Sequence, residues 1–231
     1  THALEAEGID VHYTDDISYV PSNIEETLVV YTPAIPKDMG ELVYVQEKGY
    51  RVIKRSRMLG EIAQGQRCMA VAGTHGKTTT STLVSHLFTD SGEGCSAFLG
   101  GISKNYDSNL LTHANDVIVA EADEFDRSFL QLFPEIAVIT SMDADHLDIY
   151  GDEAHIREAF KAFASQVSGT VIIKHGLDIT PADTSARIRT YSFGNPEADF
   201  HAEPLEDGHF NLHYPGGVIE DCVVGIPGWV N

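Results

Sequence analysis

One short stretch limits what this chain can fold into more than any other. It runs from Ala72 to Thr80 and reads A-G-T-H-G-K-T-T-T. The apolar run Met69–Val71 precedes it, and a helical pattern with Leu83, Val84 and Leu87 on one face follows it. The stretch therefore reads as a strand, a glycine loop and a helix, an order typical of layered α/β folds.

The glycine loop has the chemistry of a phosphate-binding loop. Glycines let backbone N–H groups approach phosphate oxygens closely, and a helix N-terminus adds positive partial charge. We expect Lys77 to reach the β- and γ-phosphates and the Thr78 hydroxyl to ligate Mg²⁺. The first glycine of the common pattern G-x-x-x-x-G-K-[ST] would fall on Val71, so this loop is a variant. Taken alone, it predicts nucleotide binding.

Strand and helix signals alternate along the chain, which favours a mostly parallel sheet with crossover helices. We expect strands near 9–13, 27–31, 50–53, 97–99, 117–120, 136–139 and 171–173, and helices near 38–48 and 153–164. The run 27–31 predicts a buried strand, and the fully apolar runs 97–99, 117–120 and 136–139 are of the kind buried on both faces. Beyond about residue 190 the sequence becomes rich in Gly, His and Tyr, which favours antiparallel hairpins. The polar stretch Gln64–Arg67 predicts a boundary between a domain at 1–65 and a second at 66–231.

Composition narrows the classes of partner. The net charge of −20, from 35 acidic and 15 basic residues, argues against non-specific nucleic-acid binding. Cys68, Cys95 and Cys222 are far apart and form no C-x-x-C pair, so neither a disulfide framework nor a zinc site is indicated. No apolar run approaches the roughly 20 residues of a membrane span. We expect a cytoplasmic protein without a membrane partner. The sequence does not indicate its oligomeric state.

Two acidic motifs follow strands of the expected sheet. Glu121-Ala122-Asp123-Glu124 comes directly after the apolar run 117–120, and Asp145-His146-Leu147-Asp148 comes shortly after the run 136–139. Because ligands of a parallel sheet sit beyond the carboxyl ends of its strands, both motifs and the glycine loop are expected at one edge. Carboxylate and imidazole groups beside a phosphate loop can form a Mg²⁺ shell.

The loop and the two acidic motifs, in this order, resemble the Mur ligase family of ATP-dependent amide-forming ligases. The resemblance extends from near Thr1 to Asn231. It implies a Rossmann-like N-terminal remnant at 1–65 that binds a UDP substrate. It also implies a central ATP-binding domain of P-loop type at 66–231, with a mostly parallel sheet and a terminal antiparallel section.

The resemblance also implies a role for each matching residue. Those implied to be catalytic are Lys77, Glu121 and His146, and those implied to hold Mg²⁺ are Thr78, Glu121 and His146. The implied nucleotide contacts are Gly73, Thr74, Gly76, Lys77, Thr78, Thr79 and Asn231. The implied substrate contacts are His75, Gly100, Gly101 and Asn109. Phe160 stands where several sister ligases carry a carbamylated lysine, so that modification is not expected.

With His75 in the loop, the chain most resembles the branch of the family that joins L-alanine to the carboxylate of UDP-N-acetylmuramate, and this resemblance implies ATP and Mg²⁺ as cofactors. The chain starts with Thr1 and stops directly after Pro227-Gly228-Trp229-Val230-Asn231, so we expect a fragment. The resemblance implies that the family's third domain and the glycine-rich turn that contacts UDP lie outside it. We therefore expect the fragment alone to be inactive.

Several alternatives remain open. Murein peptide ligase has a similar histidine-containing loop, although Ser128–Pro134 fits the alanine-adding branch better. Folylpolyglutamate synthase-type ligases usually have Asn in place of His75. A P-loop kinase or GTPase would need a glycine at Val71 and would lack the D-H-L-D motif. A nucleotide-binding fragment without activity of its own is the last alternative.

Overall fold

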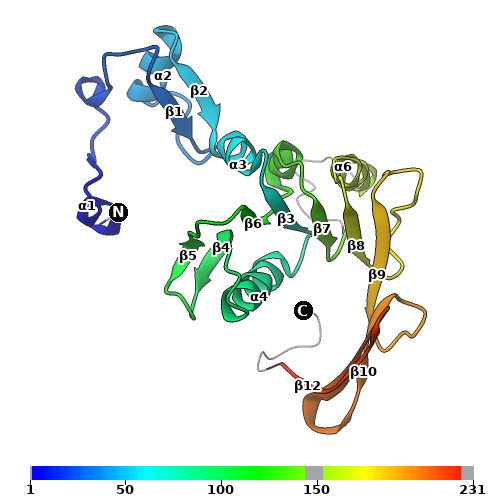
Figure 1. Ribbon diagram of the computed structural model, residues 1–231. Coiled ribbons are helices and arrows are strands. Elements are labelled where there is room, and N and C mark those ends of the chain that lie inside the picture. Colours follow the sequence, from blue (N-terminus) through cyan, green and yellow to red (C-terminus); the bar gives the residue numbers. More distant parts are fainter. Residues whose placement is uncertain (1, 144–152, 225–231) are drawn as a thin grey trace. The chain divides into compact units, whose positions relative to one another are not determined.

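A computed structural model describes residues 2–143 and 153–224 (Figure 1). The chain divides into two compact units, Thr1–Met58 and Leu59–Asn231. Helix α3 (Arg55–Ala63) crosses from one unit to the other. The domain boundary expected after residue 65 falls close to this division and remains a prediction.

The first unit holds two short parallel strands and the segments around them. Its elements are α1 (His2–Ala6), η1 (Ile17–Tyr19), β1 (Leu28–Tyr31), α2 (Gly40–Glu47) and β2 (Arg51–Lys54). Asp15 fixes the start of α2, because its carboxylate accepts hydrogen bonds from the Gly40 and Glu41 amides at 2.6 and 2.8 Å. Leu42, Val45 and Tyr50 form the small core.

Two expectations for this unit were wrong. The alternating run at 9–13 is not a strand: no strand of the described chain pairs with it, and His12 instead stacks on Tyr19. The run at 27–31 does form a strand, but it is not fully buried, since Leu28 and Val30 are exposed. Among the described residues β1 pairs only with β2, so its apolar composition does not correspond to burial on both faces.

The second unit is built on one ten-stranded sheet with the order β12-β11-β10-β9-β8-β7-β3-β6-β4-β5. Its strands are β3 (Arg67–Ala72), β4 (Ser96–Ser103), β5 (Ser108–Leu111), β6 (Val117–Glu121), β7 (Ile136–Ile139), β8 (Thr170–Lys174), β9 (Arg187–Phe193), β10 (Phe200–Pro204), β11 (His209–Tyr214) and β12 (Gly217–Val223). The strands from β4 across to β10 pair in parallel, while β5, β11 and β12 pair antiparallel. The predicted mostly parallel sheet is confirmed.

The C-terminal strands depart from the expected hairpins in one respect. β11 and β12 are antiparallel to their neighbours, but β10 pairs in parallel with β9. Asp199, just before β10, accepts hydrogen bonds from the Thr190 amide at 2.8 Å and from Arg189 at 2.6 Å. These bonds lower the pKa of the Asp199 carboxyl, the Thr190 amide contributing most. They tie the connection back onto β9, so β10 starts beside it.

Helices cover both faces of the central strands, which is why those strands are apolar throughout. Along β6, Val117 and Val119 face the core shared with α4 (Lys77–Asp90), and Ile118 and Ala120 face the core shared with α6 (Glu153–Ser165). Figure 1 shows α4 and α6 on either side of these strands. The described part of this unit also contains two short 3₁₀ helices, η2 (Phe125–Gln131) and η3 (Glu206–Gly208).

Within 2–143 and 153–224, every helix falls short of the length and apolar character needed to cross a membrane. Cys68 and Cys95 are free thiols inside the core, and burial raises the pKa of the Cys68 thiol to about 12. Such a thiol stays protonated near neutral pH, so it packs as a small apolar side chain rather than acting as a nucleophile.

The aromatic core between η2 and α6 gives a stability prediction. Phe163 is fully buried and stacks on Phe129 with ring centroids 5.0 Å apart. We expect Phe163→Ala to lower the free energy of unfolding of this unit by about 3–5 kcal/mol, because it leaves a cavity. Phe133→Ala is the matched control: Phe133 is 70% exposed, so its loss should cost less than about 1 kcal/mol. Denaturant unfolding followed by circular dichroism measures both, and equal losses would contradict this packing.

Candidate functional site

The glycine loop lies where three strands of the sheet end together. β3 is flanked by β6 and β7 in parallel, so the carboxyl ends of all three meet at one edge. The loop leaves β3 there and enters α4 through Gly76, whose left-handed backbone (φ +81°) suits glycine. Gly73 is equally constrained, because a Cβ atom on it would lie 2.1 Å from the Thr140 Oγ1. The predicted convergence is confirmed for the loop and the first acidic motif, whereas the second motif, Asp145–Asp148, lies outside the described residues.

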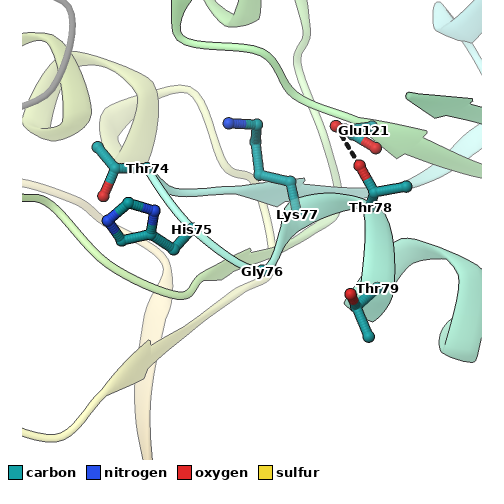
Figure 2. Close-up of a pocket in the computed structure, with 7 residues that line it drawn as sticks. All are labelled: Thr74, His75, Gly76, Lys77, Thr78, Thr79 and Glu121. Carbon is teal, nitrogen blue, oxygen red and sulfur yellow. Dashed lines mark hydrogen bonds between the residues drawn. The ribbon is translucent and has the colours of Figure 1, made fainter. Parts of the chain in front are cut away.

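An open pocket of about 360 Å³ surrounds the loop, lined by Thr74, His75, Gly76, Lys77, Thr78, Thr79 and Glu121 (Figure 2). Every one of these residues is among the site residues expected from the sequence. They come from the loop, from the first turn of α4 and from the end of β6. The pocket is therefore the candidate phosphate site.

Residues that follow β7 hold the loop in shape. The Ser141 Oγ accepts a hydrogen bond from the His75 amide at 2.9 Å and lies 2.8 Å from the Thr74 Oγ1. The Thr140 hydroxyl donates to the Ala72 carbonyl at 3.2 Å and also contacts the His75 carbonyl. Sequence reasoning did not assign a role to Thr140 or Ser141. Their position directly after an apolar strand was the available signal.

Thr78 and Glu121 form the pair expected to bind a metal. The Thr78 hydroxyl donates to the Glu121 Oε1 at 3.0 Å, as Figure 2 shows. The other carboxylate oxygen of Glu121 accepts the Gly100 amide at 2.8 Å. Gly100 must be small here, because a Cβ atom on it would lie 2.4 Å from the Glu121 Oε1. A glycine on β4 thus fixes the orientation of this carboxylate.

The Thr78–Glu121 pair fits Mg²⁺. This ion prefers oxygen ligands and usually binds through one or two protein groups, with phosphates and waters completing its shell. A hydroxyl and a carboxylate beside a phosphate loop provide that minimal set. Among the described residues, no group of three His, Cys, Asp or Glu side chains is arranged to hold a metal ion by itself.

Lys77 has a partner that is not among the expected site residues, Glu124. Its ammonium donates to the Glu124 oxygens at 3.0 and 2.9 Å and to the Gly73 carbonyl at 2.9 Å. The Glu124 side chain is 1% exposed and that of Lys77 is 15% exposed. The two glutamates of the acidic motif therefore have different partners: Glu121 contacts Thr78, and Glu124 contacts Lys77.

The remaining expected residues differ in how the structure places them. The side chain of His75 is 61% exposed, with its Nε2 3.8 Å from a carboxylate oxygen of Asp143. Gly101 lies near Thr78, whereas Asn109 lies on β5 and does not line the pocket. His146 and Asn231 lie outside the described residues, so their expected roles remain predictions.

Comparison with known proteins identifies relatives along the whole chain. The model of the Mur ligase middle domain matches residues 71–231, and that of the Mur ligase family catalytic domain matches residues 1–67. The UDP-N-acetylmuramate–L-alanine ligase of Porphyromonas gingivalis is 47% identical over 242 residues, covering 100% of this chain and 53% of the relative. That of Christiangramia forsetii is 43% identical over 99% of this chain and 51% of the relative. The chain thus spans about half the length of the curated relatives it matches.

Two solved structures share the fold. The UDP-N-acetylmuramate–alanine ligase of Thermotoga maritima has a TM-score of 0.79 at 22% identity, covering 99% of this chain and 53% of the other. The UDP-N-acetylmuramate:L-alanyl-γ-D-glutamyl-meso-diaminopimelate ligase of Neisseria meningitidis has a TM-score of 0.84 at 22% identity, covering 100% of this chain and 77% of the other. At such identities the two structures support the α/β architecture described above.

The close approach of Gly100 to Glu121 gives a prediction for this site. A methyl group in Gly100→Ala should push the Glu121 carboxylate away from Thr78, weakening Mg²⁺-dependent nucleotide binding by roughly tenfold. Gly101→Ala is the matched control, because its Cβ atom would meet nothing closer than Thr78 Cγ2 at 3.4 Å. Calorimetric titration with Mg²⁺ and ADP compares the variants. Equal affinities for the two variants would show that Gly100 does not determine the orientation of the Glu121 carboxylate.

Proposed function

This chain belongs to the Mur ligase family, and we propose that it is the N-terminal and middle part of an ATP-dependent ligase joining L-alanine to UDP-N-acetylmuramate. The observation that carries the proposal is the site itself: Lys77 and the Thr78–Glu121 pair stand side by side at the start of one helix. The 43–47% identity to curated alanine-adding ligases supports this choice of substrates. We assign the reaction to cytoplasmic peptidoglycan precursor synthesis.

The difficulty of the reaction is that a carboxylate is a poor acyl donor. Phosphorylation of the muramate carboxylate by ATP gives an acyl phosphate. The alanine amine then attacks the acyl carbon, and inorganic phosphate leaves from the tetrahedral intermediate. Catalysis of the first step rests on positioning and on stabilising charge spread over the phosphoryl oxygens.

The chain's own residues supply that positioning. The amides of the loop and the ammonium of Lys77 face the pocket and would bind the β- and γ-phosphates. Thr78 and Glu121 would hold Mg²⁺, which neutralises charge on the phosphates when bound. We propose His146 as the holder of a second Mg²⁺, Asn231 as an adenine contact, and His75, Gly100, Gly101 and Asn109 as contacts to the muramyl substrate.

A second candidate is the murein peptide ligase reaction, in which a recycled peptide replaces alanine. Its support is the fold shared with the Neisseria ligase, whose name specifies a tripeptide. The higher identity to alanine-adding relatives favours alanine. The two reactions use the same acyl phosphate and differ only in the amine, so one assay separates them.

That assay is ADP release by the full-length protein with ATP, Mg²⁺ and UDP-N-acetylmuramate. Amines offered in separate reactions are L-alanine, glycine, L-serine and the tripeptide L-Ala-γ-D-Glu-meso-diaminopimelate. We expect release to depend on L-alanine, and preference for the tripeptide would reverse the choice between the candidates. We further expect no alanine-dependent release from residues 1–231 alone. Detectable release would overturn this part of the proposal.

Loss of the loop lysine should stop the reaction. We expect Lys77→Ala to lower the turnover of the full-length protein by at least roughly a hundredfold, because a preorganised charge at the phosphoryl group is lost. The variant should still fold, with a lower melting temperature, since the buried carboxylate of Glu124 loses its ion pair with Lys77. Lys48→Ala, at the exposed end of α2, is the matched control and should leave turnover unchanged. Near-normal turnover in Lys77→Ala would refute the assignment.

A further inference from the structure

The ammonium of Lys77 is fully engaged within the protein. A lysine ammonium has three N–H donors. In this structure it makes three hydrogen bonds, one to the Gly73 carbonyl and two to the carboxylate of Glu124. A phosphate oxygen can accept from Lys77 only by displacing one of these bonds or by sharing a donor. Glu124 therefore competes directly with any phosphate that enters the loop.

Glu124 is also firmly anchored. Its own carbonyl accepts the Arg127 amide at 2.9 Å, and the Asp123 carbonyl accepts the Phe129 amide at 2.8 Å. The Asp123 carboxylate caps the same turn by accepting the Phe125 amide at 3.1 Å. Phe129 is buried against the aromatic rings of α6. The turn that carries Glu124 is thus fixed to the core, and its carboxylate cannot follow Lys77 far.

We propose that Glu124 is a positioning residue for Lys77. It holds the ammonium in place over the loop before nucleotide binds, and it gives up part of that contact when phosphate arrives. This inference rests on the proposed function only in that the loop binds the phosphates of a nucleotide. Glu124 touches neither substrate nor metal in this account, and its effect on the phosphate site passes through its contact with Lys77.

The proposal predicts opposite effects on affinity and on turnover. In Glu124→Gln the competing charge is gone and Lys77 has no counter-ion, so its ammonium should attract phosphate more strongly. We expect Mg²⁺–ADP to bind about tenfold tighter, as measured by calorimetry on the full-length protein. We expect kcat to fall by about tenfold, because the ammonium is no longer held where charge develops. A residue with a merely structural role would weaken both quantities when it is replaced.

A double-mutant cycle tests whether Glu124 acts through Lys77. In a Lys77→Met background, Glu124→Gln should leave the affinity for Mg²⁺–ADP unchanged within about twofold, because the group it works through is absent. Glu197→Gln is the charge-matched control. The side chain of Glu197 is 80% exposed and lies 4.0 Å from His175, so neither affinity nor kcat should change.

Glu124→Asp covers the case in which Glu124→Gln does not fold. It keeps the charge but retracts the carboxylate by one methylene group, so Mg²⁺–ADP should again bind more tightly and kcat should again fall, each by a smaller factor. Weaker or unchanged Mg²⁺–ADP binding in the folded variant would overturn the inference. An equal effect of Glu124→Gln in the Lys77→Met background would also overturn it. A wild-type protein that binds no Mg²⁺–ADP would instead overturn the proposed function, and this inference with it.

Discussion

The site depends on two carboxylates, three positions apart, that hold two consecutive residues at the start of α4. Glu121 accepts the Thr78 hydroxyl, and Glu124 accepts the Lys77 ammonium. Glu121 ends β6 and Glu124 follows it. β6 pairs in parallel with β3, and the glycine loop leaves β3 at the same edge. Because the sheet fixes the spacing of β3 and β6, it also fixes the spacing of the loop and the acidic motif. The geometry of the pocket is therefore set mainly by main-chain pairing.

A second set of contacts supports the loop from β7, the strand on the other side of β3. Thr140 and Ser141 follow β7 and hold the backbone of Ala72 and His75 and the side chain of Thr74. The loop is thus supported from the strands on both sides of β3. This arrangement preorganises the amides before any ligand is present, so less conformational entropy needs to be lost on binding. Such preorganisation suits a site whose chemistry is mostly positioning.

The sequence predicted those features that depend on local pattern. Buried strands such as β6 and β7 were found because their apolar runs need cover on both faces, and the loop was found from its glycines and Lys77. Strand order placed the loop and the first acidic motif at one edge, and the resemblance to the Mur ligases implied the pairing of Thr78 with Glu121. Features that depend on a partner elsewhere in the chain were missed or wrong. The run at 9–13 alternates apolar and polar residues as a strand does, yet it pairs with no strand of the described chain. The contact of Glu124 with Lys77 depends on the folded arrangement of two segments 47 positions apart, which the sequence pattern does not show.

Burial of the Lys77–Glu124 pair has a consequence for how the protein responds to ionic strength. Dissolved ions screen charges that water reaches, and they screen buried pairs much less. With side chains 15% and 1% exposed, this pair lies mostly beyond that screening. A protein with a net charge of −20 is otherwise strongly affected by salt at its surface. Its loop lysine should therefore keep the same position in dilute buffer and in concentrated salt.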